Sequence, residues 1–272
     1  MASTDTNPAT TDIKGDVAAP STPPYGGNPL YNAHGPGEAR LAAFGGEFQP
    51  GLYRPTEHRK FGNPAPLGLS AFALTTFVLS LINLSTRDVT QPNIVLSLAF
   101  GYGGLVQLLA GMWEMAVGNT FGATALSSYG GFWISYAIVL TPGFDALAVY
   151  GTADSASVLG FFLTGWFIFT FLLLLCTLRS TVMFCGLFFT LDLAFLFLAT
   201  SEFAAGNGNM TASVALQKAG GVFGLLAAFL AWYNAFAGMA DTSNSFFIIP
   251  VFHFPWSEKA REARTKTERE IV

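Results

Sequence analysis

Residues 158–178 read VLGFFLTGWFIFTFLLLLCTL, a run without a single charged side chain. An α-helix rises about 1.5 Å per residue, so a helix of this length covers the roughly 30 Å hydrocarbon core of a bilayer. Transmembrane β-strands are about ten residues long and alternate in polarity, and this run does not alternate. The stretch therefore predicts a membrane-spanning helix.

Further apolar runs of similar length stand on both sides of this one. The predicted spans cover residues 64–84, 94–117, 121–140, 158–178, 181–203 and 212–240. Charged residues make up 11% of the chain, whereas a soluble domain carries about 25%. The expected fold class is therefore an all-α polytopic membrane protein with six transmembrane helices.

The regions before and after the six predicted spans differ from them in composition. Residues 1–60 are polar and rich in Pro, Gly, Ser and Thr, which predicts a disordered tail. The transmembrane domain takes residues 61–241. Residues 242–272 hold an apolar, proline-interrupted segment at 246–256, expected along the membrane interface, and a charged tail.

Positive charges predict the orientation, because cytoplasmic loops carry an excess of Lys and Arg. With six spans, most of these residues fall on one side: Arg54, Arg59, Lys60, Arg179, Lys259, Arg261, Arg264, Lys266 and Arg269. Both termini are therefore expected in the cytoplasm, with the pore running through the six helices.

Several functional classes are excluded by what the chain contains. A net charge of −4 indicates no nucleic-acid partner. The sequence has no nucleotide-binding loop, no metal-ligand spacing and no pairing of a nucleophile with a base. We therefore expect no enzyme activity, no cofactor and no metal.

The most unusual segment opens the first span, at residues 63–77, NPAPLGLSAFALTTF. Its two prolines are tolerated at a helix start, Asn63 is suited to cap the helix, and Gly68 permits close approach. Two interpretations remain open for this segment. It is either a stiff cap at the membrane surface or a gate whose free backbone groups meet an anion. The residues concerned are Asn63, Pro64, Ala65, Pro66, Leu67 and Gly68.

This segment resembles the signature of the acetate uptake transporter family, which includes bacterial succinate–acetate permeases and fungal acetate/ammonium transporters. The resemblance continues through WEMAVGNTFGAT at 113–124, SSYGGFW at 127–133 and AWYNAFAG at 231–238. It covers about residues 61–250. The long polar N-terminal tail resembles that of the fungal branch.

The resemblance implies a plasma-membrane transporter that takes up acetate together with protons, and in some members succinate or other short acids. It also implies a homohexamer with one six-helix pore per subunit, and fungal members are tied to ammonium export. The family's narrow hydrophobic constriction is formed by a Phe, a Tyr and a Leu. By motif position these are Phe72, Tyr129 and Leu193.

The residues themselves agree with such a constriction. Phe72, Tyr129 and Leu193 lie on alternate spans, and an apolar ring of this kind hinders hydrated ions while a methyl group passes. The Tyr129 hydroxyl is available to hold a carboxylate. For any single apolar position, packing in the core or against lipid is the ordinary alternative.

Polar residues inside the spans are costly unless they face a cavity or a partner. Glu114 is the leading proton-handling candidate; its alternative is a structural carboxyl paired with Asn119. Asp192 either pairs with Arg179 or Lys218 or faces the pore. Further hydrogen bonds along a pore are expected from eight polar residues: Asn63, Thr75, Thr76, Gln107, Asn119, Thr120, Thr124 and Asn234.

Two glycine pairs have the spacing used in helix packing, Gly118 with Gly122 and Gly220 with Gly224. The sequence leaves open whether they serve contacts within one subunit or between subunits. Three functions also stay open: a proton-coupled acetate transporter, a passive channel for acetic acid or ammonia, and an acetate sensor without flux.

Overall fold

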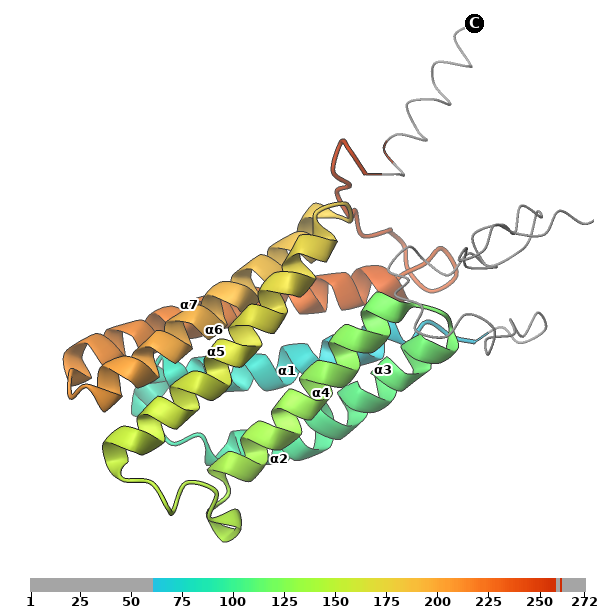
Figure 1. Cartoon of the computed structure of the whole chain (residues 1–272). Helices are drawn as coiled ribbons and strands as arrows, with labels where there is room; N and C mark the ends of the chain where they lie inside the picture. Colours follow the sequence, from blue (N-terminus) through green and yellow to red (C-terminus); the bar gives the residue numbers. More distant parts are fainter. Residues whose placement is uncertain (1–60, 258–259, 261–272) are drawn as a thin grey trace, which may run out of the picture. The chain divides into compact units, whose positions relative to one another are not determined.

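The computed structural model describes residues 61–257 and residue 260. The predicted disordered tail, residues 1–60, and most of the charged C-terminal tail lie outside these residues. The described chain is a bundle of long helices joined by short connections (Figure 1). All the predicted spans fall within it.

Within residues 61–257, six helical segments are long and apolar enough to cross a membrane. The helices are α1 (Ala65–Asn83), α2 (Asn93–Phe100), α3 (Gln107–Ala116), α4 (Thr120–Leu140), α5 (Thr152–Thr177), α6 (Val182–Gly206) and α7 (Met210–Met239). The second span consists of α2, a π-helical turn (Gly101–Val106) and α3. The all-α class with six apolar spans is confirmed.

Side chains at the helix starts explain where several spans begin. The side-chain oxygens of Asn119, Thr181 and Asn209 accept hydrogen bonds from backbone N–H groups in the first turns of α4, α6 and α7. Such caps satisfy donors that have no partner within the helix. The start of α5 differs from the prediction: the helix begins at Thr152, since polar residues continue a helix beyond the hydrocarbon core.

The π-helical turn in the second span was not predicted, and two of its glycines lie in close contacts. A Cβ added at Gly103 would lie 2.5 Å from Thr75 Oγ1 on α1, and one at Gly104 would lie 2.2 Å from the Ala99 carbonyl oxygen. Only glycine fits such close approach. Single π-turns inside α-helices occur often at functional sites.

Small residues also bring α7 close to its neighbours. A Cβ at Gly224 would lie 2.2 Å from Ser80 Oγ on α1, and one at Gly220 would lie 2.8 Å from Leu198 on α6. The pair Gly220 and Gly224 therefore serves contacts within the subunit. Gly118 lies in the turn before α4 with a φ of 83°, so it does not take part in a helix-packing pair.

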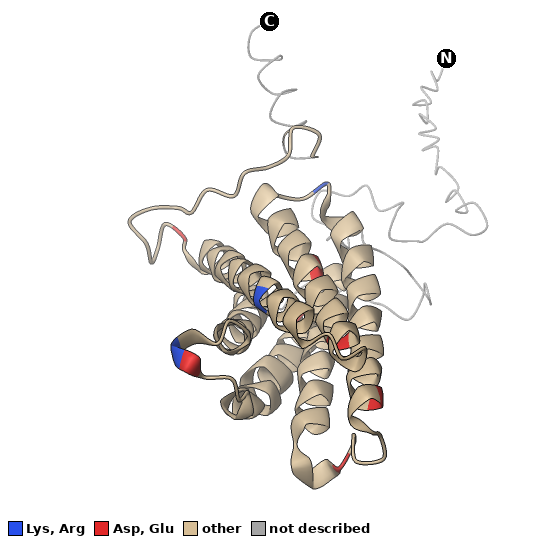
Figure 2. Ribbon diagram, turned by 90° about the vertical axis from the view of Figure 1, so that its left-hand side faces the viewer, with Lys and Arg blue, Asp and Glu red and all other residues tan. Residues whose placement is uncertain are grey.

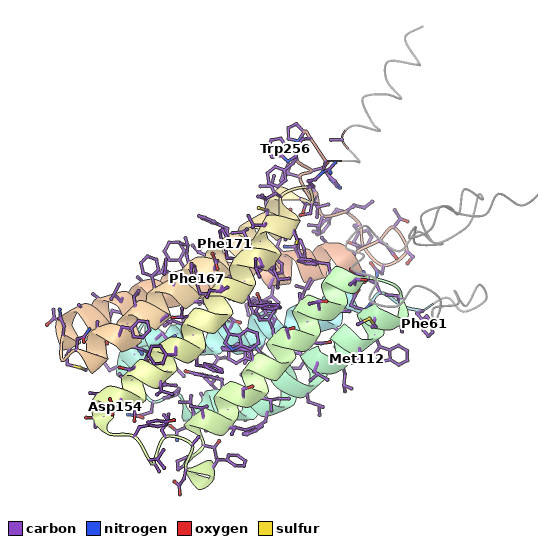
Figure 3. The ribbon with its side chains drawn as sticks, in the orientation of Figure 1. Phe61, Met112, Asp154, Phe167, Phe171 and Trp256 are labelled. Carbon is purple, nitrogen blue, oxygen red and sulfur yellow. The ribbon has the colours of Figure 1, made fainter. Side chains whose placement is uncertain are left out.

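The outside of the bundle is apolar, as lipid contact requires. Charged side chains lie mainly in connections and near helix ends (Figure 2). Large apolar side chains such as Met112 and Phe171 are exposed and point away from the bundle (Figure 3). A water-facing surface rarely carries so continuous an apolar patch, whereas a bilayer covers it.

The segment 246–256 was expected along the membrane interface; the structure ties it to the connection between α5 and α6. The Val182 N–H donates to the Phe252 carbonyl over 2.7 Å, and Trp256 Nε1 donates to the Leu178 carbonyl over 2.8 Å. Tyr233 on α7 donates its hydroxyl to the Pro250 carbonyl. The exposed side chains of the segment 246–256, Phe247 among them, are placed for lipid contact.

Candidate transport pathway

Two cavities lie within the bundle, one toward each end. The near cavity, with a volume of about 170 Å³, lies where α1 begins, and its wall includes Ala65 and Ser180. The far cavity, with a volume of about 220 Å³, lies toward the opposite end, and its wall includes Asn83 and Leu140. Each has room for several molecules of the size of water.

Apolar side chains lie where the two cavities meet. Phe72 on α1 and Leu191 on α6 line both of them. Tyr129 on α4 lines the near cavity, and its ring packs against that of Phe72 with centroids 5.9 Å apart. We call Phe72, Tyr129 and Leu191 the partition. Its side chains are 5%, 3% and 5% exposed, so none of them faces lipid.

Leu191, and not Leu193, is the one of these two leucines on α6 that lines the cavities. The Leu193 side chain is half-buried and lines neither cavity. Two residues correspond to about 200° of rotation around an α-helix, so Leu191 and Leu193 point in nearly opposite directions from α6. The helix is apolar on both sides, and its sequence therefore did not distinguish the two leucines.

The Tyr129 hydroxyl is directed away from the cavities. It forms a hydrogen bond of 2.9 Å with Thr170 Oγ1 on α5, and Thr170 is fully buried and lines neither cavity. Part of the hydrogen-bonding capacity of this hydroxyl is thus used by Thr170, and its availability to a carboxylate stays a prediction. The ring, which is apolar, is the part that Tyr129 contributes to the partition.

The proline-rich motif stands at the mouth of the near cavity. Asn63 Oδ1 accepts a hydrogen bond from the Ala65 N–H over 3.2 Å, but the N-cap of α1 is Pro64, and among the described residues no side chain caps this helix. A Cβ at Gly68 would lie 2.6 Å from Leu126 on α4, so this glycine permits close packing. Ala65 lines the cavity, whereas the Leu67 side chain is exposed.

Two of the predicted polar residues line the near cavity. Asn119 does so while it caps α4, and Gln107 does so at the start of α3. Gln107 is fully buried, and neither polar atom of its amide has a hydrogen-bond partner among the described residues. Because a buried amide without partners is costly, this side chain is suited to bind a solute or water in the cavity.

Glu114 lies behind the cavity wall. Its Oε2 accepts a hydrogen bond of 2.6 Å from Asn119 Nδ2, and the residue lines neither cavity. Its other oxygen, Oε1, is buried without a partner. This geometry matches the structural alternative, in which the carboxyl holds Asn119 in place at the cavity wall.

Four other predicted polar residues line neither cavity: Thr120, Thr124, Asp192 and Asn234. Thr124 is exposed, and Asn234 donates to the Leu230 carbonyl of its own helix. Asp192 is buried, with one carboxyl oxygen that has no hydrogen-bond partner in the described part of the chain. Asp192 nevertheless lies next to Leu191 in the chain and interacts electrostatically with Tyr129, so it is near the partition.

Glu202 and Trp133 line the far cavity and did not feature among the predicted site residues, whereas Thr76, which also lines it, was among the polar residues expected along a pore. Among the described residues, Glu202 is the single charged side chain in the walls of the two cavities. Thr76 Oγ1 and Trp133 Nε1 are buried there without partners in the described part of the chain. The signal for Glu202 was present in the sequence, as an acid within the fifth apolar run, one residue before its end.

Comparisons with known proteins agree on one family. The model of the GPR1/FUN34/yaaH family matches residues 44–256. The chain is 66% identical to acetate permease A of Emericella nidulans, over 86% of this chain and 80% of that protein. It is 50% identical to ammonia transport outward protein 2 of Saccharomyces cerevisiae, over 80% of this chain and 75% of that protein.

Bacterial proteins match over the helical domain. The chain is 34% identical to the succinate-acetate/proton symporter SatP of Escherichia coli K12, over 71% of this chain and 96% of that protein. A solved structure described as the bacterial acetate channel SatP superimposes with a TM-score of 0.61 at 32% identity, covering 71% of this chain and 99% of the other. These matches confirm the resemblance seen in the sequence, and the chain belongs to the GPR1/FUN34/yaaH family of membrane transport proteins.

Proposed function

We propose that this chain takes up acetate across the plasma membrane together with protons, through the partition of Phe72, Tyr129 and Leu191. The observation that carries the proposal is the pair of cavities that meet at two shared side chains. The relatives named acetate permease A and succinate-acetate/proton symporter support the same solute.

The chemistry of the partition favours a proton and a carboxylate passing together. A carboxylate that leaves water without a partner pays a large desolvation cost. The partition offers apolar side chains, and the Tyr129 hydroxyl is already bonded to Thr170. Acetate therefore crosses as neutral acetic acid, with one proton per molecule, and its methyl group passes the apolar layer more readily than a hydrated ion.

The walls of the two cavities carry the polar groups that the partition lacks. In the near cavity, Gln107 and Asn119 offer amide groups to the solute. In the far cavity, the Glu202 carboxyl is the group able to exchange a proton with a carboxylate. This assignment moves the proton-handling role from Glu114, which is bonded to Asn119 behind the wall, to Glu202.

A passive channel is the second candidate. The solved relative described as an acetate channel favours it, and an apolar partition passes acetic acid or ammonia in either direction without coupling. Ammonium export, suggested by the relatives named ammonia transport outward proteins, belongs to this candidate. A sensor that binds acetate without flux is the third. The homohexamer and the cytoplasmic termini complete the proposal as expectations from the family.

Uptake of labelled acetate into proteoliposomes tests the proposal. An inward proton gradient should drive acetate above its equilibrium level, and collapse of the gradient with a protonophore should release it. Protein-free liposomes with the same gradient report the unaided permeation of acetic acid and must be subtracted. A channel for the neutral acid would accumulate acetate on the same gradient, so liposomes preloaded with unlabelled acetate separate the two. A faster initial uptake of label into preloaded liposomes favours the coupled transporter, an unchanged initial rate favours the channel, and no flux beyond the protein-free level favours the sensor.

A further inference from the structure

Tyr129 is held in the partition from several sides. Its ring packs against Phe72, Trp166, Phe169 and Phe188, with centroid distances from 5.9 to 6.4 Å. These contacts are apolar, and the hydroxyl is the one part of the side chain that needs a polar partner. That partner is Thr170.

Thr170 differs from the other threonines of its helix. The hydroxyls of Thr164 and Thr177 donate to carbonyls of α5 itself, those of Gly160 and Leu174. A threonine in a membrane helix ordinarily satisfies its hydroxyl in this way. The hydrogen bond recorded for Thr170 instead crosses to α4, with an oxygen–oxygen distance of 2.9 Å.

We propose that Thr170 is a positioning residue that sets the selectivity of the partition by holding the Tyr129 hydroxyl out of the pathway. The inference deepens the proposed function and rests on it. Thr170 itself touches no solute, since it is fully buried and lines neither cavity. It acts through the orientation of the ring that does line the pathway.

Loss of the Thr170 hydroxyl leaves the Tyr129 hydroxyl buried and without a partner. Because burying such a group is unfavourable, the ring turns until the hydroxyl reaches the near cavity, where Gln107 and water can bond it. The partition then gains a polar group and loses its close contact with Phe72. Larger, more polar acids such as lactate are no longer excluded.

The test compares initial uptake of labelled acetate and lactate in proteoliposomes. We expect Thr170→Val to lower the preference for acetate over lactate by about tenfold, a change that corresponds to the loss of one buried hydrogen bond. Thr170→Ser, which keeps the hydroxyl, should retain the preference. Thr164→Val is the matched control, because its hydroxyl bonds its own helix, and it should leave the preference unchanged.

A double-mutant cycle separates positioning from general damage to the fold. Replacing both partners of a buried hydrogen bond by apolar groups can be nearly neutral. The pair Tyr129→Phe with Thr170→Val should therefore recover most of the preference that Thr170→Val loses alone. Size-exclusion chromatography in detergent confirms that each variant is folded. If Thr170→Val cannot be purified in folded form, Thr170→Ala replaces it in the same cycle.

The outcomes are distinct. Three results would each overturn the inference: an unchanged preference in Thr170→Val, an equal loss of the preference in Thr170→Ser, or no recovery of the preference in the double variant. Acetate flux through the wild-type chain would still uphold the proposed function. No flux through the wild-type chain would overturn the proposed function and the inference with it.

Discussion

Phe72 on α1 and Leu191 on α6 are the two side chains that the near and far cavities share. The Tyr129 ring packs against Phe72 beside them. In the proposed pathway a solute that moves from one cavity to the other passes these three side chains, so single substitutions among them should change which molecules pass.

Shortening either shared side chain should widen the partition. We expect Phe72→Ala and Leu191→Ala to raise lactate uptake relative to acetate by about tenfold or more, since small differences in apolar contact are worth about 1–3 kcal/mol. Uptake of both labelled acids in proteoliposomes measures the ratio. Leu193→Ala is the matched control on the same helix, and an equal effect there would contradict the partition as drawn.

Gln107→Leu should weaken solute binding without loss of stability. The amide is fully buried and has no partner in the described residues, so an apolar replacement of similar size removes an unfavourable burial. We expect the apparent KM for acetate to rise while the melting temperature in detergent stays equal or rises. Asn234→Leu, at a site away from both cavities, should leave KM unchanged; a melting temperature lowered by Gln107→Leu would argue for a structural amide.

Glu202, which is half-buried, and Glu114, which is buried, should respond differently to removal of their charge. Glu202→Gln should flatten the dependence of acetate uptake on pH, because a glutamine in the far cavity cannot exchange a proton. Uptake initial rates across a pH series with the gradient held constant provide the measurement. If Glu202→Gln kept the full pH profile, the proton would be handled elsewhere.

Glu114 should instead affect stability. Glu114→Ala removes the acceptor of the Asn119 hydrogen bond and should lower the free energy of unfolding by about 1–3 kcal/mol. Glu114→Gln keeps an acceptor oxygen and should be milder, with the wild-type pH profile of uptake. A pH profile altered by Glu114→Gln would restore this residue as the proton-handling group.

Gly103→Ala should disturb the packing of the second span on the first. The added methyl group would lie 2.5 Å from Thr75 Oγ1, and overpacking of this kind costs about 1–3 kcal/mol. Gly101→Ala is the matched control in the same π-helical turn, since its methyl group meets nothing within 4 Å. Thermal melting in detergent compares them; equal melting temperatures would contradict the close contact with Thr75.

The sequence predicted the fold class because membrane insertion depends on little more than length and polarity. Each apolar run had to become a helix to satisfy its own backbone in hydrocarbon. The limits of five spans were correct to within about three residues. The exception, the start of α5 at Thr152, lies outside the hydrocarbon, where polarity no longer marks a helix end. The π-helical turn at Gly101–Val106 depends on contacts with α1 and was not predictable from its glycines.

The motifs were enough to identify the family, and they singled out Phe72 and Tyr129, both of which line cavities in the structure. The sequence analysis chose Leu193 and Glu114, whereas the packing of the helices places Leu191 and Glu202 in the cavity walls. Helices such as α6 are apolar on all sides, with lipid on one and the bundle on the other, so no amphipathic pattern reports their rotation. Only the packing of α6 between α5 and α7 fixes that rotation, and with it which side chain meets the solute.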